Sequence, residues 1–105
     1  MSEVAVPLND EAARALAEGR KRHITSLSSY GSEGDTFRAF GGVYKIVRVS
    51  LIPLGRVADA FYAEEGASSP GEFKRQWVDS HKMTGFVPAR LVCVHVVEPV
   101  LHEGL

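Results

Sequence analysis

The feature that most constrains the fold is a pair of β-rich stretches that only two glycines separate. Residues 36–40 (TFRAF) and 43–52 (VYKIVRVSLI) are dense in aromatic and β-branched side chains, the residue types that strands prefer. Gly41 and Gly42 between them supply the positive φ angles of a two-residue primed turn. The sequence therefore predicts a β-hairpin. In its second strand, we expect the buried face to carry Val43, Val47, Val49 and Leu51.

Three helices are predicted around this hairpin. The first has Asn9 or Asp10 as its cap and ends at Gly19. Apolar residues at helical spacing over 54–65 predict a second helix of about three turns. A third helix has Ser69 as its N-cap, followed by a proline and then by a glutamate at the position that completes a capping box. Its expected buried side carries Phe73, Trp77 and Val78.

Two further strands complete the expected fold. A brief strand at residues 24–25 follows the first helix, and residues 90–98 (RLVCVHVVE) are so rich in valine that we expect a strand covered on both faces. The order of elements lacks regular βαβ alternation, which favours a mixed or antiparallel sheet curled toward a small barrel. At 105 residues, the chain is predicted to form a single α+β domain over residues 1–105.

Composition excludes several classes of protein. Hydrophobic residues make up 45 % and charged residues 24 % of the chain, which is typical of globular domains and not of disordered ones. The net charge of −1 excludes a protein that coats nucleic acid through bulk charge, so any such contact needs a local patch. A lone cysteine and four histidines without ligand spacing predict no metal site and no cofactor. These histidines are His23, His81, His95 and His102, and we expect His95 to be a satisfied core or cleft residue.

No segment predicts insertion into a membrane or export. No apolar run approaches the roughly 20 residues that span a bilayer. The first residues contain neither the basic segment nor the apolar stretch that is found in signal peptides. We therefore expect a cytoplasmic protein with no membrane partner.

Several motifs in succession resemble an ASCH domain of the PUA-like superfamily. After the first helix come residues 19–21 (GRK), 33–37 (EGDTF), 44–47 (YKIV) and 69–74 (SPGEFK), and Trp77 follows them. The likeness covers about residues 11–97. It implies a PUA-like small β-barrel with about three flanking helices, and a cleft beside the first helix through which the family is thought to bind RNA.

A basic run beside this cleft leads to the first functional hypothesis, an RNA-binding or nucleotide-binding module. Arg20, Lys21, Arg22 and His23 follow one another, and we expect them to contact phosphate. Tyr30 or Tyr44 is expected to offer a stacking surface for an unpaired base. The partner on this hypothesis is RNA or a nucleoside-like small molecule.

The alternative is an enzyme. Some small ASCH members are similar to amidohydrolases that remove the acyl group of N4-acetylcytidine with a lysine, a threonine and a glutamate. The resemblance carries these roles to Lys21, to Thr25, which lies one residue beyond the family spacing, and to Glu72. Lys21 and Thr25 have the same parity on a strand and can share a face, whereas Glu72 can equally serve as a helix-capping residue. A non-catalytic adaptor is the third hypothesis.

Overall fold

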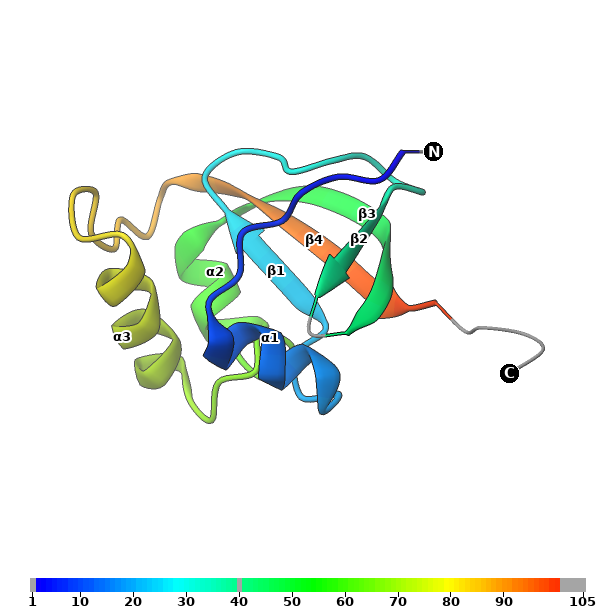
Figure 1. Ribbon diagram of the computed structural model, residues 1–105. Coiled ribbons are helices and arrows are strands. Elements are labelled where there is room, and N and C mark those ends of the chain that lie inside the picture. The colour runs from blue at the N-terminus through cyan, green and yellow to red at the C-terminus, as the bar shows by residue number, and fades with distance from the viewer. Residues whose placement is uncertain (1, 40, 101–105) are drawn as a thin grey trace.

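Four strands form one antiparallel sheet in the order β1-β4-β3-β2, and three helices lie beside it (Figure 1). The computed structural model describes residues 2–39 and 41–100. The sheet curls into a half-barrel, so the predicted α+β class with a curled antiparallel sheet and three helices is confirmed. The elements are α1 (Asp10–Ala17), β1 (His23–Ser26), β2 (Thr36–Ala39), β3 (Gly42–Pro53), α2 (Leu54–Ala60), α3 (Pro70–Ser80) and β4 (Leu91–Pro99).

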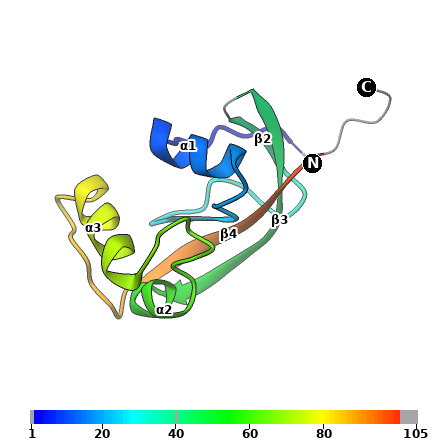
Figure 2. The ribbon, with the colours of Figure 1, turned by 90° about the horizontal axis from the view of Figure 1, so that it is seen from below.

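Strand β4 lies between two hydrophobic clusters, as its valine-rich sequence predicts. Val92 and Val94 pack with residues of α2 and α3 on one face of the sheet. Val97 packs on the other face with Leu16 of α1 and Ile24 of β1. Figure 2 shows α1 and α2 on opposite sides of the β1–β4 pair. Because successive strand residues point to opposite faces, a strand buried on both faces must be apolar almost throughout.

The predicted hairpin between β2 and β3 is confirmed, but the turn lies one residue earlier than expected. Gly42 pairs with Ala39 and is the first residue of β3, while Gly41 adopts a φ of 79°, in the left-handed region that glycine tolerates. Tyr44 then points into the core opposite Phe37, and Gly42 lies against its ring.

The predicted buried face of β3 is wrong near the hairpin and at Leu51, whereas Val49 packs against a core cluster as expected. The buried residues near the hairpin are Tyr44 and Ile46, and Leu51 is 66 % exposed. A β-bulge at Val47 divides the strand: Ile46 pairs with Val97 and Arg48 with Val96, so Val47 is an extra residue in the ladder, and the core-facing residues change from Tyr44 and Ile46 before it to Val49 after it. A bulge reverses the alternation of side chains beyond it, and no single parity describes both halves of the strand.

The helices follow their capping signals. Asn9 caps α1 by accepting the amide N–H of Ala12 at 2.8 Å, and Ser69 caps α3 by accepting that of Glu72 at 3.1 Å. Helix α2 ends at Ala60 after seven residues, so the expected three turns are too many. Val78, expected in the core, is instead 41 % exposed. Within residues 2–39 and 41–100, no helix has the length and apolar character needed to cross a bilayer.

Candidate functional site

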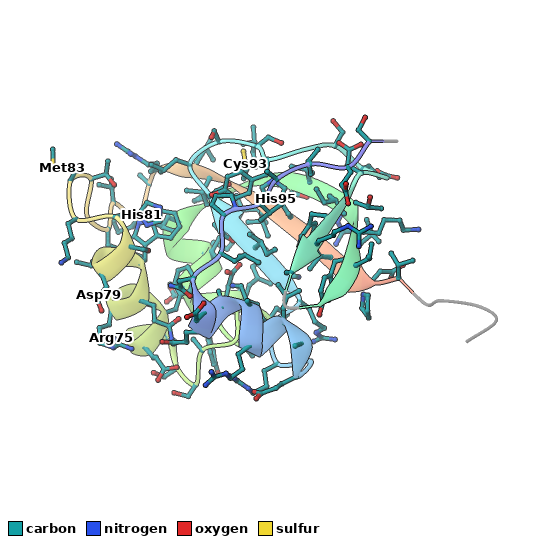
Figure 3. The ribbon with its side chains drawn as sticks, in the orientation of Figure 1. Arg75, Asp79, His81, Met83, Cys93 and His95 are labelled. Carbon is teal, nitrogen blue, oxygen red and sulfur yellow. The ribbon has the colours of Figure 1, made fainter. Side chains whose placement is uncertain are left out.

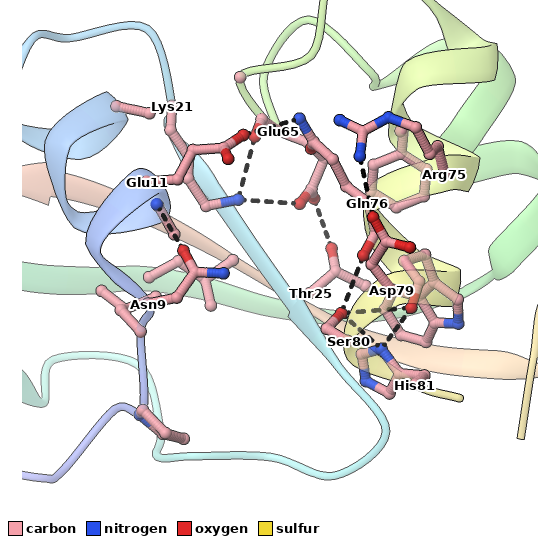
Figure 4. A pocket seen from close by; sticks show the side chains of 18 of the residues that line it. Asn9, Glu11, Lys21, Thr25, Glu65, Arg75, Gln76, Asp79, Ser80 and His81 are labelled. Carbon is pink, nitrogen blue, oxygen red and sulfur yellow. Dashed lines mark hydrogen bonds and ion pairs between the residues drawn. The ribbon is translucent and has the colours of Figure 1, made fainter. Parts of the chain in front are cut away.

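A cavity of about 630 Å³ opens between α1, β1 and α3 (Figure 4). Helix α1 contributes Glu11 and Ala12 to its wall, and α3 contributes Trp77 among others. Thr25 of β1 and Glu65, from the turn after α2, lie in its lining. Segments far apart in the sequence therefore meet around one space, which is where ligand sites commonly form.

Two polar side chains, those of Lys21 and Thr25, converge in this cavity on the carboxylate of Glu65. The Lys21 ammonium donates to Glu65 Oε1 at 3.3 Å and to the Glu65 backbone carbonyl at 3.0 Å. The Thr25 hydroxyl donates to the other carboxylate oxygen, Oε2. Figure 4 shows both donors directed at the same carboxyl group. The predicted meeting of Lys21 and Thr25 therefore occurs, with Glu65 as the group that joins them.

Burial changes the chemistry of this cluster. The side chain of Glu65 is 3 % exposed and that of Lys21 is 11 % exposed. Burial raises the pKa of Glu65 above its ordinary value, because a desolvated carboxylate loses its hydration. The Lys21 ammonium and the Thr25 hydroxyl oppose this rise by stabilising the ionised form. Glu65 is therefore a stronger proton acceptor than a surface glutamate, held between two donors.

Gly66 fixes the approach of this turn to Lys21. Its φ of 87° is in the left-handed region, and a Cβ atom there would lie 3.3 Å from the Cβ of Lys21. The backbone N–H of Lys21 in turn bonds to the carbonyl of Ala15 in α1 at 3.1 Å. The lysine backbone is thus held from one side by α1, while the absence of a side chain at Gly66 allows Glu65 to reach it from the other.

The basic run is paired with carboxylates. Arg20 contacts Glu18 at 2.8 Å and Arg22 contacts Glu64 at 3.8 Å, while Lys21 is bonded to Glu65. His23 is half-buried, with its ring 5.7 Å from that of Phe61, and burial lowers its pKa. Among the described residues that line the cavity, Arg20, Lys21 and Arg75 balance Glu11, Glu65 and Asp79. The cavity has no excess of positive charge, so it suits a neutral ligand better than a polyanion.

The two tyrosines proposed for stacking have different surroundings. Tyr44 is 6 % exposed and its ring stacks on Phe37, so it belongs to the core, and the expectation of an accessible stacking surface is wrong for it. Tyr30 lines the cavity and stacks on His95 at 5.4 Å. His95 is buried, with Nδ1 2.8 Å from the carbonyl of Ile24 and Nε2 accepting the Tyr30 amide N–H. It is a satisfied core histidine, as predicted.

The fold has close matches among solved structures. A high-resolution crystal structure of an ASCH domain from Lactobacillus crispatus JV V101 matches with a TM-score of 0.68 at 17 % sequence identity, over 96 % of this chain and 80 % of that one. This chain has the ASCH fold. Protein EF3133 from Enterococcus faecalis V583, of family DUF984, matches with a TM-score of 0.61 at 15 % identity, over 94 % of this chain and 75 % of that one.

A third structure with the same fold is the hypothetical protein PH0355, which matches at a TM-score of 0.61 and 16 % identity over 94 % of this chain and 96 % of that one. No model of a known family matches the sequence, and no curated protein sequence matches it. At these identities the likeness establishes the ASCH fold alone, and activity must be argued from the site.

Within the ASCH fold, Glu72 lies apart from Lys21 and Thr25. Its carboxylate accepts the backbone N–H of Ser68 at 3.0 Å at the start of α3, and this bond lowers its pKa. Glu72 lines a second, smaller cavity of about 360 Å³, which also contacts Arg20 and Gly66. The capping role of Glu72 is therefore visible in its contacts, and the carboxylate beside Lys21 and Thr25 is that of Glu65.

Sequence reasoning missed Glu65 because its position offered no signal. It follows Glu64, which is partly exposed, and both fall where the second helix was expected to finish. The turn from Phe61 to Gly66 places Glu65 next to β1.

As for metals, the described part of the chain brings together no group of three or more histidine, cysteine, aspartate or glutamate side chains that could hold an ion.

Proposed function

We propose that the chain is an amidohydrolase that cleaves the N-acyl amide of a neutral, nucleoside-sized substrate, with Lys21, Thr25 and Glu65 as its catalytic residues. The observation that carries this proposal is the convergence of the Lys21 ammonium and the Thr25 hydroxyl on a buried carboxylate in a cavity of balanced charge. A hydroxyl hydrogen-bonded to a base is the arrangement that activates a weak nucleophile.

The roles follow from these hydrogen bonds. The Thr25 oxygen attacks the amide carbonyl carbon while its proton moves to Glu65, whose raised pKa makes it an effective base. Lys21 supplies positive charge to the oxygen that becomes negative in the tetrahedral intermediate. The C–N bond then breaks as Glu65 returns the proton to the leaving nitrogen. Water, deprotonated by Glu65, attacks the threonine ester, and Thr25 recovers a proton as the carboxylic acid leaves.

N4-acetylcytidine is the first substrate to test, because the resemblance to ASCH amidohydrolases suggests it and because it carries no charge. Cytidine release is followed by chromatography. Thr25→Ala and Glu65→Gln are expected to reduce turnover by at least about a hundredfold, in the range that general-base catalysis contributes. Glu72→Gln is the matched control, since it removes a carboxylate that lies outside the Lys21–Thr25 cluster. Turnover that survives Thr25→Ala would refute the assignment of Thr25 as the nucleophile.

RNA or nucleotide binding is the second candidate, and one observation favours it. The exposed arginines Arg20 and Arg75 both line the cavity, although each pairs with a carboxylate on its own segment. An RNA segment that displaced these carboxylates would bind with an affinity that falls as salt rises. Titration of a short single-stranded RNA at two salt concentrations tests this. An affinity that is insensitive both to salt and to Arg20→Ala would exclude phosphate contact by this arginine.

A further inference from the structure

One wall of the cavity takes no part in the proposed chemistry. It is formed by the last turn of α3, where the rings of Trp77 and His81 stack in parallel, with centroids 3.8 Å apart and planes inclined by 9°. Both residues line the cavity that contains Thr25 and Glu65. Figure 3 shows His81 at the end of α3, and Figure 4 shows it on the same cavity wall as Ser80.

The hydrophobic core fixes the indole of this aromatic pair in place. Trp77 is 4 % exposed, and its indole N–H donates to the carbonyl of Gly85 at 3.1 Å. Phe73 packs beside it, with ring centroids 6.2 Å apart. One face of the imidazole is therefore covered by a ring that the core fixes in place. His81 lines the cavity, and the face away from the indole together with the ring edge is what its imidazole can offer to a ligand.

The hydrogen bonds of Nδ1 determine whether the imidazole edge presents a donor or an acceptor to the cavity. Nδ1 of His81 lies 3.0 Å from the backbone carbonyl of Trp77, which can only accept a hydrogen bond, and 3.0 Å from the Ser80 hydroxyl, which can donate or accept. Because the Ser80 hydroxyl has its own acceptor in the carbonyl of Gln76 at 3.0 Å, we assign the imidazole proton to Nδ1, which leaves a lone pair on Nε2. The ring presents a flat surface together with a hydrogen-bond acceptor, and these are the two elements by which side chains recognise an unpaired base.

A helix-capping role alone accounts for less of this geometry. His81 ends α3, and its backbone N–H bonds to the carbonyls of Trp77 and Val78. Capping by the imidazole needs only the bond to a terminal carbonyl. It does not require the ring to lie flat on the indole, nor to line the cavity that holds the Lys21–Thr25–Glu65 cluster.

We infer that the Trp77–His81 stack is the platform that selects the substrate, by carrying its planar heterocycle on the open imidazole face while Nε2 of His81 accepts a hydrogen bond from a group of the substrate beyond the stacked ring. The inference rests on the proposed function for the reaction at Thr25 and adds its specificity: planar heterocyclic amides are preferred over alkyl amides. His81 is a binding residue in this scheme and takes no part in proton transfer.

Kinetics of three variants test the platform with N4-acetylcytidine and N-butylacetamide as substrates. His81→Ala is expected to raise KM for N4-acetylcytidine about tenfold and leave kcat within about twofold, because stacking and the acceptor act in binding. His81→Phe keeps a ring but loses the acceptor, so its KM should lie between those of the wild type and His81→Ala. Val78→Ala, a partly exposed position in the same turn but outside the cavity lining, is the control and should leave both constants unchanged.

Binding separates failure of the platform from failure of the proposed function. Cytidine is titrated into each protein while Trp77 fluorescence is recorded, and thermal unfolding is measured to show that every variant is folded. If the wild type cleaves no amide but binds cytidine about tenfold more tightly than His81→Ala, the enzyme proposal fails and the platform stands. If His81→Ala leaves both the KM and the cytidine affinity unchanged, or if the wild type binds no cytidine, the platform is refuted.

Discussion

The buried pair of Lys21 and Glu65 allows a quantitative prediction about stability. Lys21→Met removes the ammonium but keeps most of the apolar side chain, and it leaves the Glu65 carboxylate buried with Thr25 as its remaining side-chain donor. Unit charges 3.3 Å apart attract by about 5 kcal/mol at an effective dielectric constant of about 20. Breaking a buried pair by removing one partner typically costs ~3–5 kcal/mol. We expect a loss of this size in the free energy of unfolding at about pH 8.

The double variant distinguishes a charge effect from a packing effect. Glu65→Gln alone keeps hydrogen-bonding atoms next to Lys21 and Thr25, so its cost should be smaller, at ~1–3 kcal/mol. In Lys21→Met combined with Glu65→Gln, no unpaired charge remains. We expect the double variant to be more stable than Lys21→Met, with a coupling energy of ~2 kcal/mol or more.

The pH dependence gives an independent test of the same reasoning. Burial already raises the pKa of Glu65, and removal of Lys21 removes the charge that opposes this rise. A carboxyl whose pKa is higher in the folded state than in the unfolded state contributes stability at acid pH and loses it as pH rises through the folded-state value. The deficit of Lys21→Met relative to wild type should therefore grow as pH rises. The double variant has no carboxyl at position 65, so its deficit relative to wild type should not grow with pH.

Urea unfolding followed by the fluorescence of Trp77, the one tryptophan, measures these energies. The wild type and the three variants are compared at about pH 5 and about pH 8. A cost for Lys21→Met below about 1 kcal/mol, or one that does not change with pH, would refute the picture of a buried, charge-paired Glu65. Strict additivity in the double variant would refute it as well.

Three further predictions concern the scaffold. Leu54→Ala, at a fully buried position of α2, should cost ~2–5 kcal/mol in chemical denaturation, whereas Leu51→Ala on the exposed part of β3 should change stability by less than about 0.5 kcal/mol; equal costs would contradict the exposure of Leu51. Gly66→Ala should lower the free energy of unfolding by more than about 1 kcal/mol, because an alanine there must adopt a positive φ and its Cβ would press on Lys21. An unchanged melting temperature would contradict this. Glu72→Gln should lower the melting temperature at neutral pH. The pKa of Glu72 is lowered in the fold, so the stability that its carboxylate adds is present above the unfolded-state pKa and is lost as pH falls through the folded-state pKa. The difference in melting temperature between wild type and Glu72→Gln should therefore vanish in acid. A difference that persists in acid would argue against a capping role for the carboxylate.

The scaffold could be predicted from sequence to the extent that local chemistry determines it. Asn9 and Ser69 carry capping side chains, and Gly41 marks the hairpin, because each acts on residues a few positions away. The buried face of β3 was not predictable by parity, since the bulge at Val47 arises from how β3 pairs with a strand about 50 residues later.

The candidate site was predictable only in part, for the same physical reason. Lys21 and Thr25 are four residues apart, but Lys21 precedes β1, so strand alternation alone does not account for their approach to one carboxylate. Glu65 reaches them across about 40 residues through a turn whose path depends on α2 ending at Ala60. Local patterns do not distinguish its buried carboxylate from that of neighbouring Glu64, and the resemblance to ASCH amidohydrolases placed the catalytic role on Glu72 instead.

The central position of β4 has a consequence for how the protein is made. Val94 and Val97 complete the two hydrophobic clusters on opposite faces of the sheet, and β4 is the strand that joins β1 to β3. Until the ribosome has released these residues, β1 has no strand beside it and neither cluster is closed. The long sequence separation of these contacts means that the sheet can close only after β4 has been made. Until then, the apolar faces of α1, α2 and β3 have no strand to cover them and are open to non-native contacts.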